Sequence, residues 1–149
     1  MPDGAQQSTA GTYFFMLTLG GAEAAGFFKE CSGLSSEHQV VDHTTTDQQG
    51  KALVQKFPGQ MKWSNITLKR GVDNENQLWT WRKQVIDGDI KGARKDGQIE
   101  IMDWEGTAVV TYKFVGAWPC RYSAPGVNAA GNEILVEEIE IAHEGFERV

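Results

Sequence analysis

Cysteine and long hydrophobic runs are scarce in this sequence. Among 149 residues there are two cysteines, Cys31 and Cys120, and they do not form a Cys-x-x-Cys pair. Two free thiols in a reducing compartment are therefore a better expectation than a disulfide. The apolar run at residues 13–19 is too short to cross a bilayer, and no lysine or arginine precedes it, unlike in a signal peptide. We expect a chain that folds in the cytoplasm and does not insert into a membrane as a monomer.

Motifs for catalysis or metal binding are also missing. His38 and His43 lie five residues apart beside Asp42, but nothing elsewhere completes a metal site at a recognisable spacing. Cys31 has no evident general base, so a buried structural thiol is the better interpretation. The sequence contains no glycine-rich phosphate loop, nucleophile elbow or helical histidine pair. We predict no enzymatic activity, no cofactor and no metal site.

Basic residues are outnumbered by acidic ones. The net charge of −6 argues against specific nucleic acid binding, which needs a basic face. The charge is also uneven: residues 1–50 carry one base and six acids, residues 51–100 ten bases and six acids, and residues 101–149 three bases and eight acids. Either this charge is solvated on one globule, or oppositely charged surfaces favour head-to-tail association.

The length favours one domain, residues 1–149, which is large enough to bury a core without a metal or a disulfide. A hydrophobic content of 40% and a charged content of 23% are ordinary for a soluble globular protein. Residues 1–12 are small and polar, and we expect them to be flexible.

Short apolar segments bounded by glycine predict a mainly β fold. We expect strands at 13–19, twice within 24–41, at 59–71, as a hairpin of 98–103 with 107–119, and at 134–146. In the last segment glutamates alternate with Ile139 and Ile141, which indicates one wet and one buried face. About seven strands and one short helix favour two packed antiparallel sheets, as a sandwich or barrel.

The run VDNENQLWTWRKQVIDG predicts the helix. Asp73 can cap it, and Asn76 can reach back as a weak capping box. Gly88 supplies the left-handed residue at its end. Apolar residues at helical spacing give one broad stripe, which we expect to pack on the sheets. The residues that we assign to the core are Trp63, Leu78, Trp81, Val85 and Trp118.

A long polar segment, residues 42–58, interrupts the strand pattern. Its sequence, DHTTTDQQGKALVQKFP, has little apolar periodicity, and its only clear apolar anchors are Leu53, Val54 and Phe57. Lengthening a loop adds little to its closure entropy, but a long loop contributes no stability by itself. The usual explanation for such a segment is therefore a function.

The order and spacing of several motifs resemble those of the tail-tube proteins of contractile phage tails. The motifs are PG at 58–59, ITLKRG at 66–71, WTW in the helix, AWPCRY at 117–122 and GNEILVEEIEIAHEG at 131–145. The similarity covers residues 13–147 and is greatest to the inner-tube subunits of phage-tail-like contractile injection particles. The Hcp tube protein of type VI secretion resembles this chain more distantly, in fold.

This resemblance implies that six subunits close into a ring, and that rings stack into a rigid tube inside a contractile sheath. Such a tube is assembled in the cytoplasm, meets sheath, baseplate and tube-cap proteins, and carries cargo through a target envelope. In the family an extended arm between two early strands holds neighbouring subunits, and residues 42–58 match its position. The implied subunit-interface residues are Asp42, His43, Asp47, Lys51, Leu53, Val54, Lys56 and Phe57.

Two other functions are compatible with the residues. Five tryptophans are many for this length and could line the cup of a monomeric ligand-binding β-barrel, although core filling and interface anchoring is the plainer interpretation. The other alternative is a β-rich hydrolase with an unrecognised site. Size-exclusion chromatography with light scattering separates rings or tubes from both monomeric alternatives.

Overall fold

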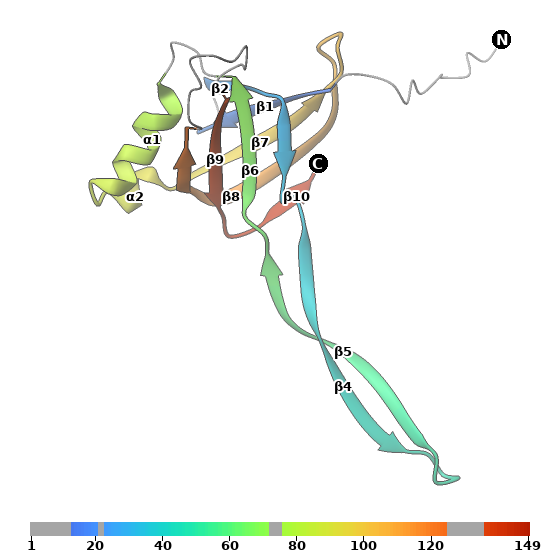
Figure 1. The fold of residues 1–149 in the computed structure, drawn as a ribbon. Helices are drawn as coiled ribbons and strands as arrows, with labels where there is room; N and C mark the ends of the chain where they lie inside the picture. Colours follow the sequence, from blue (N-terminus) through green and yellow to red (C-terminus); the bar gives the residue numbers. More distant parts are fainter. Residues whose placement is uncertain (1–12, 21–22, 72–75, 125–135) are drawn as a thin grey trace, which may run out of the picture.

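The computed structural model describes residues 13–20, 23–71, 76–124 and 136–149 as a compact body from which one long hairpin projects (Figure 1). The expected flexible segment 1–12 and the expected helix cap Asp73 lie outside the described residues. The part of the predicted loop from residue 125 onward also lies outside them.

The body consists of two antiparallel sheets that share one strand, which confirms the predicted fold class. One sheet contains β2 (Glu23–Phe28), β1 (Phe14–Leu19), β7 (Lys95–Met102) and β8 (Ala108–Ser123), with β10 (Phe146–Arg148) also paired to β8. The other contains β8, β9 (Val136–Ala142), β6 (Ile66–Gly71) and β3 (Glu30–Ser32). Consecutive neighbours pair in the order β2-β1-β7-β8-β9-β6-β3.

Strand β8 carries the chain from one sheet into the other. Its first part, up to Ala117, pairs with β7, and its last part, from Trp118 to Ser123, pairs with β9. Gly116 lies at this transition with a φ of +62°, a conformation that favours glycine, and the register with β9 shifts just beyond, between Pro119 and Arg121. The bend lets one strand serve two packed layers.

The core lies between the two sheets and under the first helix. Leu17, Ile99 and Phe114 enter it from one sheet, and Ile139 and Ile141 enter it from the other. The alternation predicted for β9 is confirmed, because both isoleucines are fully buried while the glutamates at 138 and 140 stay partly exposed. Burial of apolar side chains on both inner faces is the main stabilising contribution to this body.

The helix α1 (Gln77–Ile86) buries Leu78 and Trp81. The indole Nε1 of Trp81 donates a 2.7 Å hydrogen bond to the carbonyl oxygen of Ala93, which satisfies its one polar atom inside the core. Ala93 belongs to α2 (Ile90–Ala93), a single turn that the sequence did not predict. This bond therefore ties the two helices together.

The ends of α1 agree only in part with the prediction. Gly88 takes a φ of +93° and donates its N–H to the carbonyl of Val85, so the predicted left-handed end is confirmed. The predicted start was wrong, because the helix begins at Gln77 with Asn76 as its N-cap residue, and the Asn76 side chain makes no capping hydrogen bond. Asn76 therefore precedes the first turn instead of lying within it.

Three details of the strand and core predictions need correction. The expected strand 59–71 is broken at Ser64 and Asn65, because the residues before the break pair with a different strand from the residues after it. Trp63 and Trp118, both expected in the core, are only half-buried. Leu78 and Trp81 lie in the core, and Val85 packs against it.

A buried ion pair links the neighbouring strands β6 and β9 within one sheet. Arg70 of β6 and Glu137 of β9 are 4% and 5% exposed, and the guanidinium Nε of Arg70 donates to Glu137 Oε1. Tyr122 donates from its hydroxyl to Glu137 Oε2 at 2.6 Å, and the guanidinium lies 5.4 Å from the centre of the Phe28 ring in β2. Burial, reinforced by the Glu137 carboxylate, raises the pKa of Tyr122 to about 12. Side chains from four strands thus meet around one charge pair.

The buried indole generates the first prediction. Trp81→Ala removes a side chain that fills the core and bonds to Ala93, so it should lower the free energy of unfolding by about 3–5 kcal/mol. Trp104, which is 68% exposed, provides the matched control, and Trp104→Ala should change stability by less than about 0.5 kcal/mol. Urea denaturation followed by circular dichroism measures both, and equal stabilities for the two variants would refute the packing of α1.

The buried ion pair generates the second prediction. Glu137→Ala removes the carboxylate that compensates the Arg70 charge in the core, so it should destabilise the fold by about 3–5 kcal/mol. The control is Glu144→Ala, which breaks the exposed ion pair between Glu144 and Arg94 and should cost less than about 1 kcal/mol. A similar loss in both variants in urea denaturation would contradict the buried role of Glu137.

Candidate assembly interface

The predicted arm is a two-stranded β-hairpin that extends well beyond the body (Figure 1). Strand β4 (Ser36–Thr46) pairs antiparallel with β5 (Ala52–Trp63), and we call residues 36–63 the arm. It is longer than the predicted segment 42–58, because residues on either side of that segment continue the same ladder. Polar side chains on both strands concealed its strand character, although three successive threonines, at 44–46, favour extended backbone.

Local hydrogen bonds explain why the arm turns where it does. The carboxylate oxygen Oδ1 of Asp47 accepts from the backbone N–H groups of Gln49 and Lys51, both at 2.8 Å. Gly50 takes a φ of +81°, which glycine adopts without strain. Asp47 was predicted to lie at a subunit interface, and in this structure its carboxylate organises the tip of the arm.

An aromatic cluster fixes the base of the arm to the body. The Trp63 ring centre lies 4.9 Å from that of Phe146 and 6.0 Å from that of His143. The Nδ1 atom of His143 accepts the Gly145 N–H at 3.1 Å, so the other ring nitrogen carries the proton and donates to the Ser64 carbonyl at 2.8 Å. These contacts hold the chain where it leaves the arm and enters β6.

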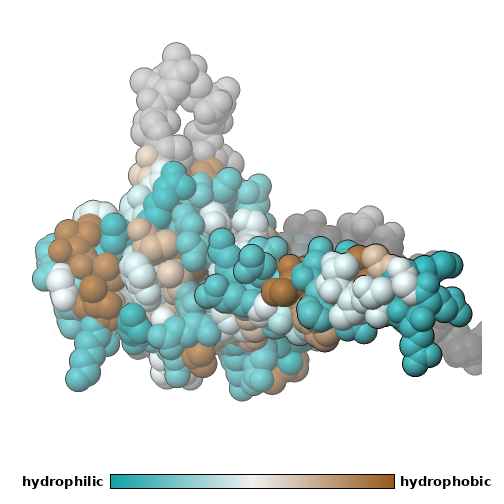
Figure 2. Space-filling model, turned by 90° about the horizontal axis from the view of Figure 1, so that it is seen from below, coloured by the Kyte–Doolittle hydropathy of each residue, from teal (hydrophilic) through white to brown (hydrophobic). Residues whose placement is uncertain are grey.

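The structure brings all of the predicted interface residues together on the arm. Most of them are exposed, and Asp47 is half-buried. The sequence interpretation missed Val40, Val41 and Met61, which are 61%, 49% and 41% exposed and lie just outside the predicted segment. Figure 2 shows hydrophobic patches on the arm among hydrophilic ones. The adjacent valines were assigned to a short strand of the body, although their position beside the arm was a usable signal.

Charges on the arm are divided between its two strands. Asp42 of β4 stands opposite Lys56 of β5, and Glu37 stands opposite Lys62. One strand therefore presents acidic side chains and the other presents basic ones. Opposite charges across a strand pair stabilise it weakly, and the same division gives the arm one acidic and one basic edge.

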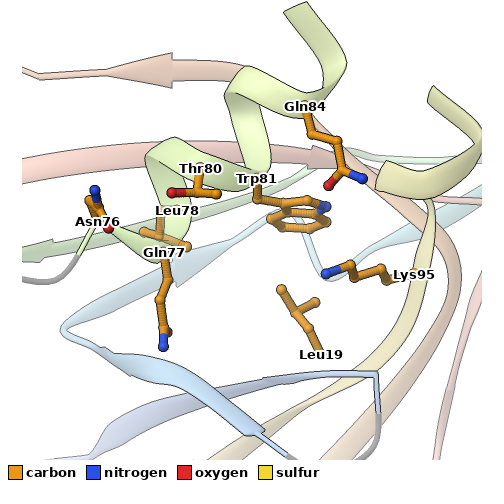
Figure 3. Close-up of a pocket in the computed structure, with 8 residues that line it drawn as sticks. All are labelled: Leu19, Asn76, Gln77, Leu78, Thr80, Trp81, Gln84 and Lys95. Atoms are coloured by element: carbon orange, nitrogen blue, oxygen red, sulfur yellow. The ribbon is translucent and has the colours of Figure 1, made fainter. Parts of the chain in front are cut away.

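The tryptophans do not gather into one cup. Trp81 and Leu78 line a cleft of about 260 Å³ together with Leu19 and Lys95 (Figure 3), a volume at the lower end for small-molecule sites. The other tryptophans lie elsewhere: Trp79 packs edge-on against Tyr122, and the remaining three lie at the arm base, on β8 and in an exposed turn.

The side chains that could support metal binding or catalysis are dispersed as well. Within the described ranges no three His, Cys, Asp or Glu side chains cluster in a way that could hold a metal ion. Burial raises the pKa of the Cys31 thiol to about 12, so this sulfur stays protonated and unreactive at neutral pH. In the part of the chain that is described, no helix is both long enough and apolar enough to span a membrane.

The chain matches a protein-family model over most of its length. Residues 11–147 match the model of the T4-like virus tail tube protein gp19 family. The chain belongs to this family of tail tube proteins. Comparison with curated proteins gave no match.

Solved structures of contractile injection systems are similar to this chain. A chain in the extended sheath-tube complex of the PVC extracellular contractile injection system is 26% identical, with a TM-score of 0.69 over 91% of this chain and 87% of that one. A chain in the tube-terminating cap of the anti-feeding prophage is 27% identical, with the same TM-score and coverage. Hcp1 from Flavobacterium johnsoniae, at 16% identity and a TM-score of 0.53 over 91% of this chain and 94% of that one, shares the fold.

The charge division of the arm generates the third prediction. Replacing Lys51 and Lys56 by glutamate reverses two of the three lysines of the arm, and we expect this to raise the protein concentration needed for assembly by roughly tenfold, on the order of 1.4 kcal/mol per contact. The effect should be largest at low salt, because ions screen exposed charges. Light scattering over a salt series measures it.

The matched control changes the same charge on the helices. Lys83→Glu with Lys91→Glu alters net charge equally but leaves the arm intact. If both double variants assemble alike at every salt concentration, the lysines of the arm are merely solvated.

Proposed function

We propose that this tail tube protein forms the rigid inner tube of a contractile tail or injection particle, as six-subunit rings that stack into a conduit. The observation that carries this proposal is the arm, whose large apolar side chains stay exposed in the part of the chain that the structure describes. An isolated two-stranded hairpin is only marginally stable in water. A function in which other subunits cover the arm accounts for its length and for its exposed residues.

The apolar residues of the arm can supply the energy of such a contact. Burying one side chain such as Val, Leu or Phe is worth about 1.5–3 kcal/mol. The arm exposes Val40, Val41, Leu53, Val54 and Phe57, each by 45% or more. Association costs on the order of 4–15 kcal/mol in lost freedom, so several of these residues must be buried together. The other predicted interface residues, Asp42, His43, Asp47, Lys51 and Lys56, set the charge and the geometry of the contact.

Electrostatics constrain how rings can stack. With −6 on each subunit, a ring of six carries 6 × −6 = −36. Rings of like charge repel each other unless local patches of opposite charge meet. The basic strand of the arm is the positive patch that this proposal requires.

The similar structures include sheath-tube, cap and baseplate assemblies, which supports sheath, baseplate and tube-cap proteins as partners of this chain. Assembly takes place in the cytoplasm, and the product is then part of a tail or tail-like particle. Cargo occupies the lumen without specific nucleic acid recognition, and the subunit performs no catalysis. Its role is mechanical: it provides a stiff, closed wall.

The fourth prediction separates folding from assembly. Replacing Thr44–Leu53 by a short Gly-Ser turn shortens the arm but leaves every core residue in place. The variant should be a soluble monomer with near-native circular dichroism and should form no rings or tubes, as seen by light scattering and negative-stain microscopy.

A control at the tip tests whether any change there is harmful. Replacing Gln48 and Gln49 by alanine keeps the hairpin length and the Asp47 turn, and tubes should form normally. A shortened variant that still makes tubes would refute the role of the arm, and one that cannot fold would place the arm in the folding core. A wild-type chain that stays monomeric at all concentrations would favour the ligand-binding alternative.

A further inference from the structure

The arm is attached to the body through a narrow base (Figure 1). Two short connections form this base, residues 33–35 before β4 and residues 64–65 after β5. Among the described elements β4 and β5 pack chiefly against each other, so contacts at the base decide the direction of the arm. Because few contacts act there, each of them carries a large share of the restraint.

Ser64 is the residue at which both strands of the arm meet the body. Its N–H donates to the Ser35 carbonyl at 3.2 Å, and the Ser35 hydroxyl donates to the Ser64 hydroxyl oxygen at 2.8 Å. The Ser64 carbonyl accepts at 2.8 Å from Nε2 of His143, which lies between β9 and β10. One hydrogen bond from His143 therefore restrains β4 and β5 together.

The His143 imidazole fits this position only when it is neutral. The Ser64 carbonyl can only accept, so Nε2 donates to it, and the Gly145 N–H at 3.1 Å can only donate, so Nδ1 keeps its lone pair. A second proton on the ring would occupy that lone pair and place two donors against each other. The bonded geometry therefore excludes the imidazolium.

Loss of the Gly145 hydrogen bond would reach the arm directly. Gly145 is buried with a φ of +146°, and a Cβ atom there would lie 3.3 Å from the Trp63 ring, so the turn packs closely on this indole. The same indole lies 4.9 Å from the centre of the Phe146 ring and 6.0 Å from that of His143. A displacement of this turn therefore loosens the rings that hold the base.

Charged groups of both signs lie on the elements around the ring. Those on the body are Arg94, Asp96, Lys113, Glu140, Glu144 and Glu147. On the arm, Lys62 stands opposite Glu37. All of them except Glu140 are exposed, and solvent and salt screen exposed charges. The two hydrogen bonds of the ring, more than any one charged neighbour, therefore decide how it responds to acid.

We propose that His143 is a pH-sensitive latch for the arm. As a neutral imidazole it holds the base against the body, and as an imidazolium it releases the base, so that the arm changes direction freely. The latched arm is favoured at neutral pH and is lost in acid. This device acts within one subunit and goes beyond the proposed tube function, so the two can fail separately.

Single-molecule fluorescence energy transfer tests the latch, because it observes monomers at picomolar concentration. One dye is attached at the arm tip through Gln48→Cys and the other on the body through Glu105→Cys, both at exposed positions. Cys31→Ala and Cys120→Ser remove the native thiols. An unperturbed imidazole titrates at about pH 6.5, so the distance distributions are compared at roughly pH 7.5 and pH 5.0.

The other two histidines, His38 and His43 on β4, are replaced by glutamine in every sample. With His143 present, the ratio of released to latched arms should rise roughly fivefold in acid, as expected for the loss of one hydrogen bond. The variants His143→Gln and His143→Asn cannot titrate, so each should give the same distribution at both pH values. An equal acid response in these variants, or no response with His143 present, would overturn the latch.

A second dye pair within the body separates release from unfolding. It joins α1 to the turn between β7 and β8 through Lys83→Cys and Glu105→Cys. This distance should stay the same at both pH values while the arm responds. If it changes together with the arm, acid unfolds the whole subunit and the latch is overturned.

Discussion

The hairpin of residues 36–63 is the constraint on which the account of this subunit depends, because it carries apolar side chains that no other described part of the chain covers. A hairpin of this kind is only marginally stable when it is isolated in water. The exposed valines of β4 and the exposed Leu53 and Phe57 of β5 become favourable only when another surface removes them from water. The structure is therefore a folded body with an attached hairpin, and the proposed tube function requires both.

The body is built to carry that element. Strand β8 belongs to both sheets, and the buried pair of Arg70 and Glu137 links β6 to β9 within one of them. The Arg70 guanidinium also lies against the Phe28 ring of the other sheet. At the base of the arm, Trp63 packs on Phe146, and His143 holds the carbonyl of Ser64. The direction of the arm is thus coupled to a stable core, which would limit the loss of entropy in the contact that we propose.

Local patterns predicted the parts of the fold that depend on one segment. The alternation around Ile139 and the glycine at position 88 were sufficient for β9 and for the end of α1. Features that join distant segments could not be predicted in this way. Arg70 and Glu137 are 67 residues apart and look like surface charges in the sequence. The arm was recognised as unusual, but its strands were not, because their side chains do not alternate between apolar and polar as those of a strand with one buried face do.

Amide hydrogen exchange of the arm, compared between monomers and assembled particles, decides whether assembly covers it. The backbone of β4 and β5 should exchange quickly in dilute monomers and become strongly protected in assembled material. Amides of β9, which lies in the core, should be protected in both samples and serve as the internal reference. Equal exchange of the arm in both samples would show that assembly leaves it uncovered, and the arm would then not be the element that joins the subunits.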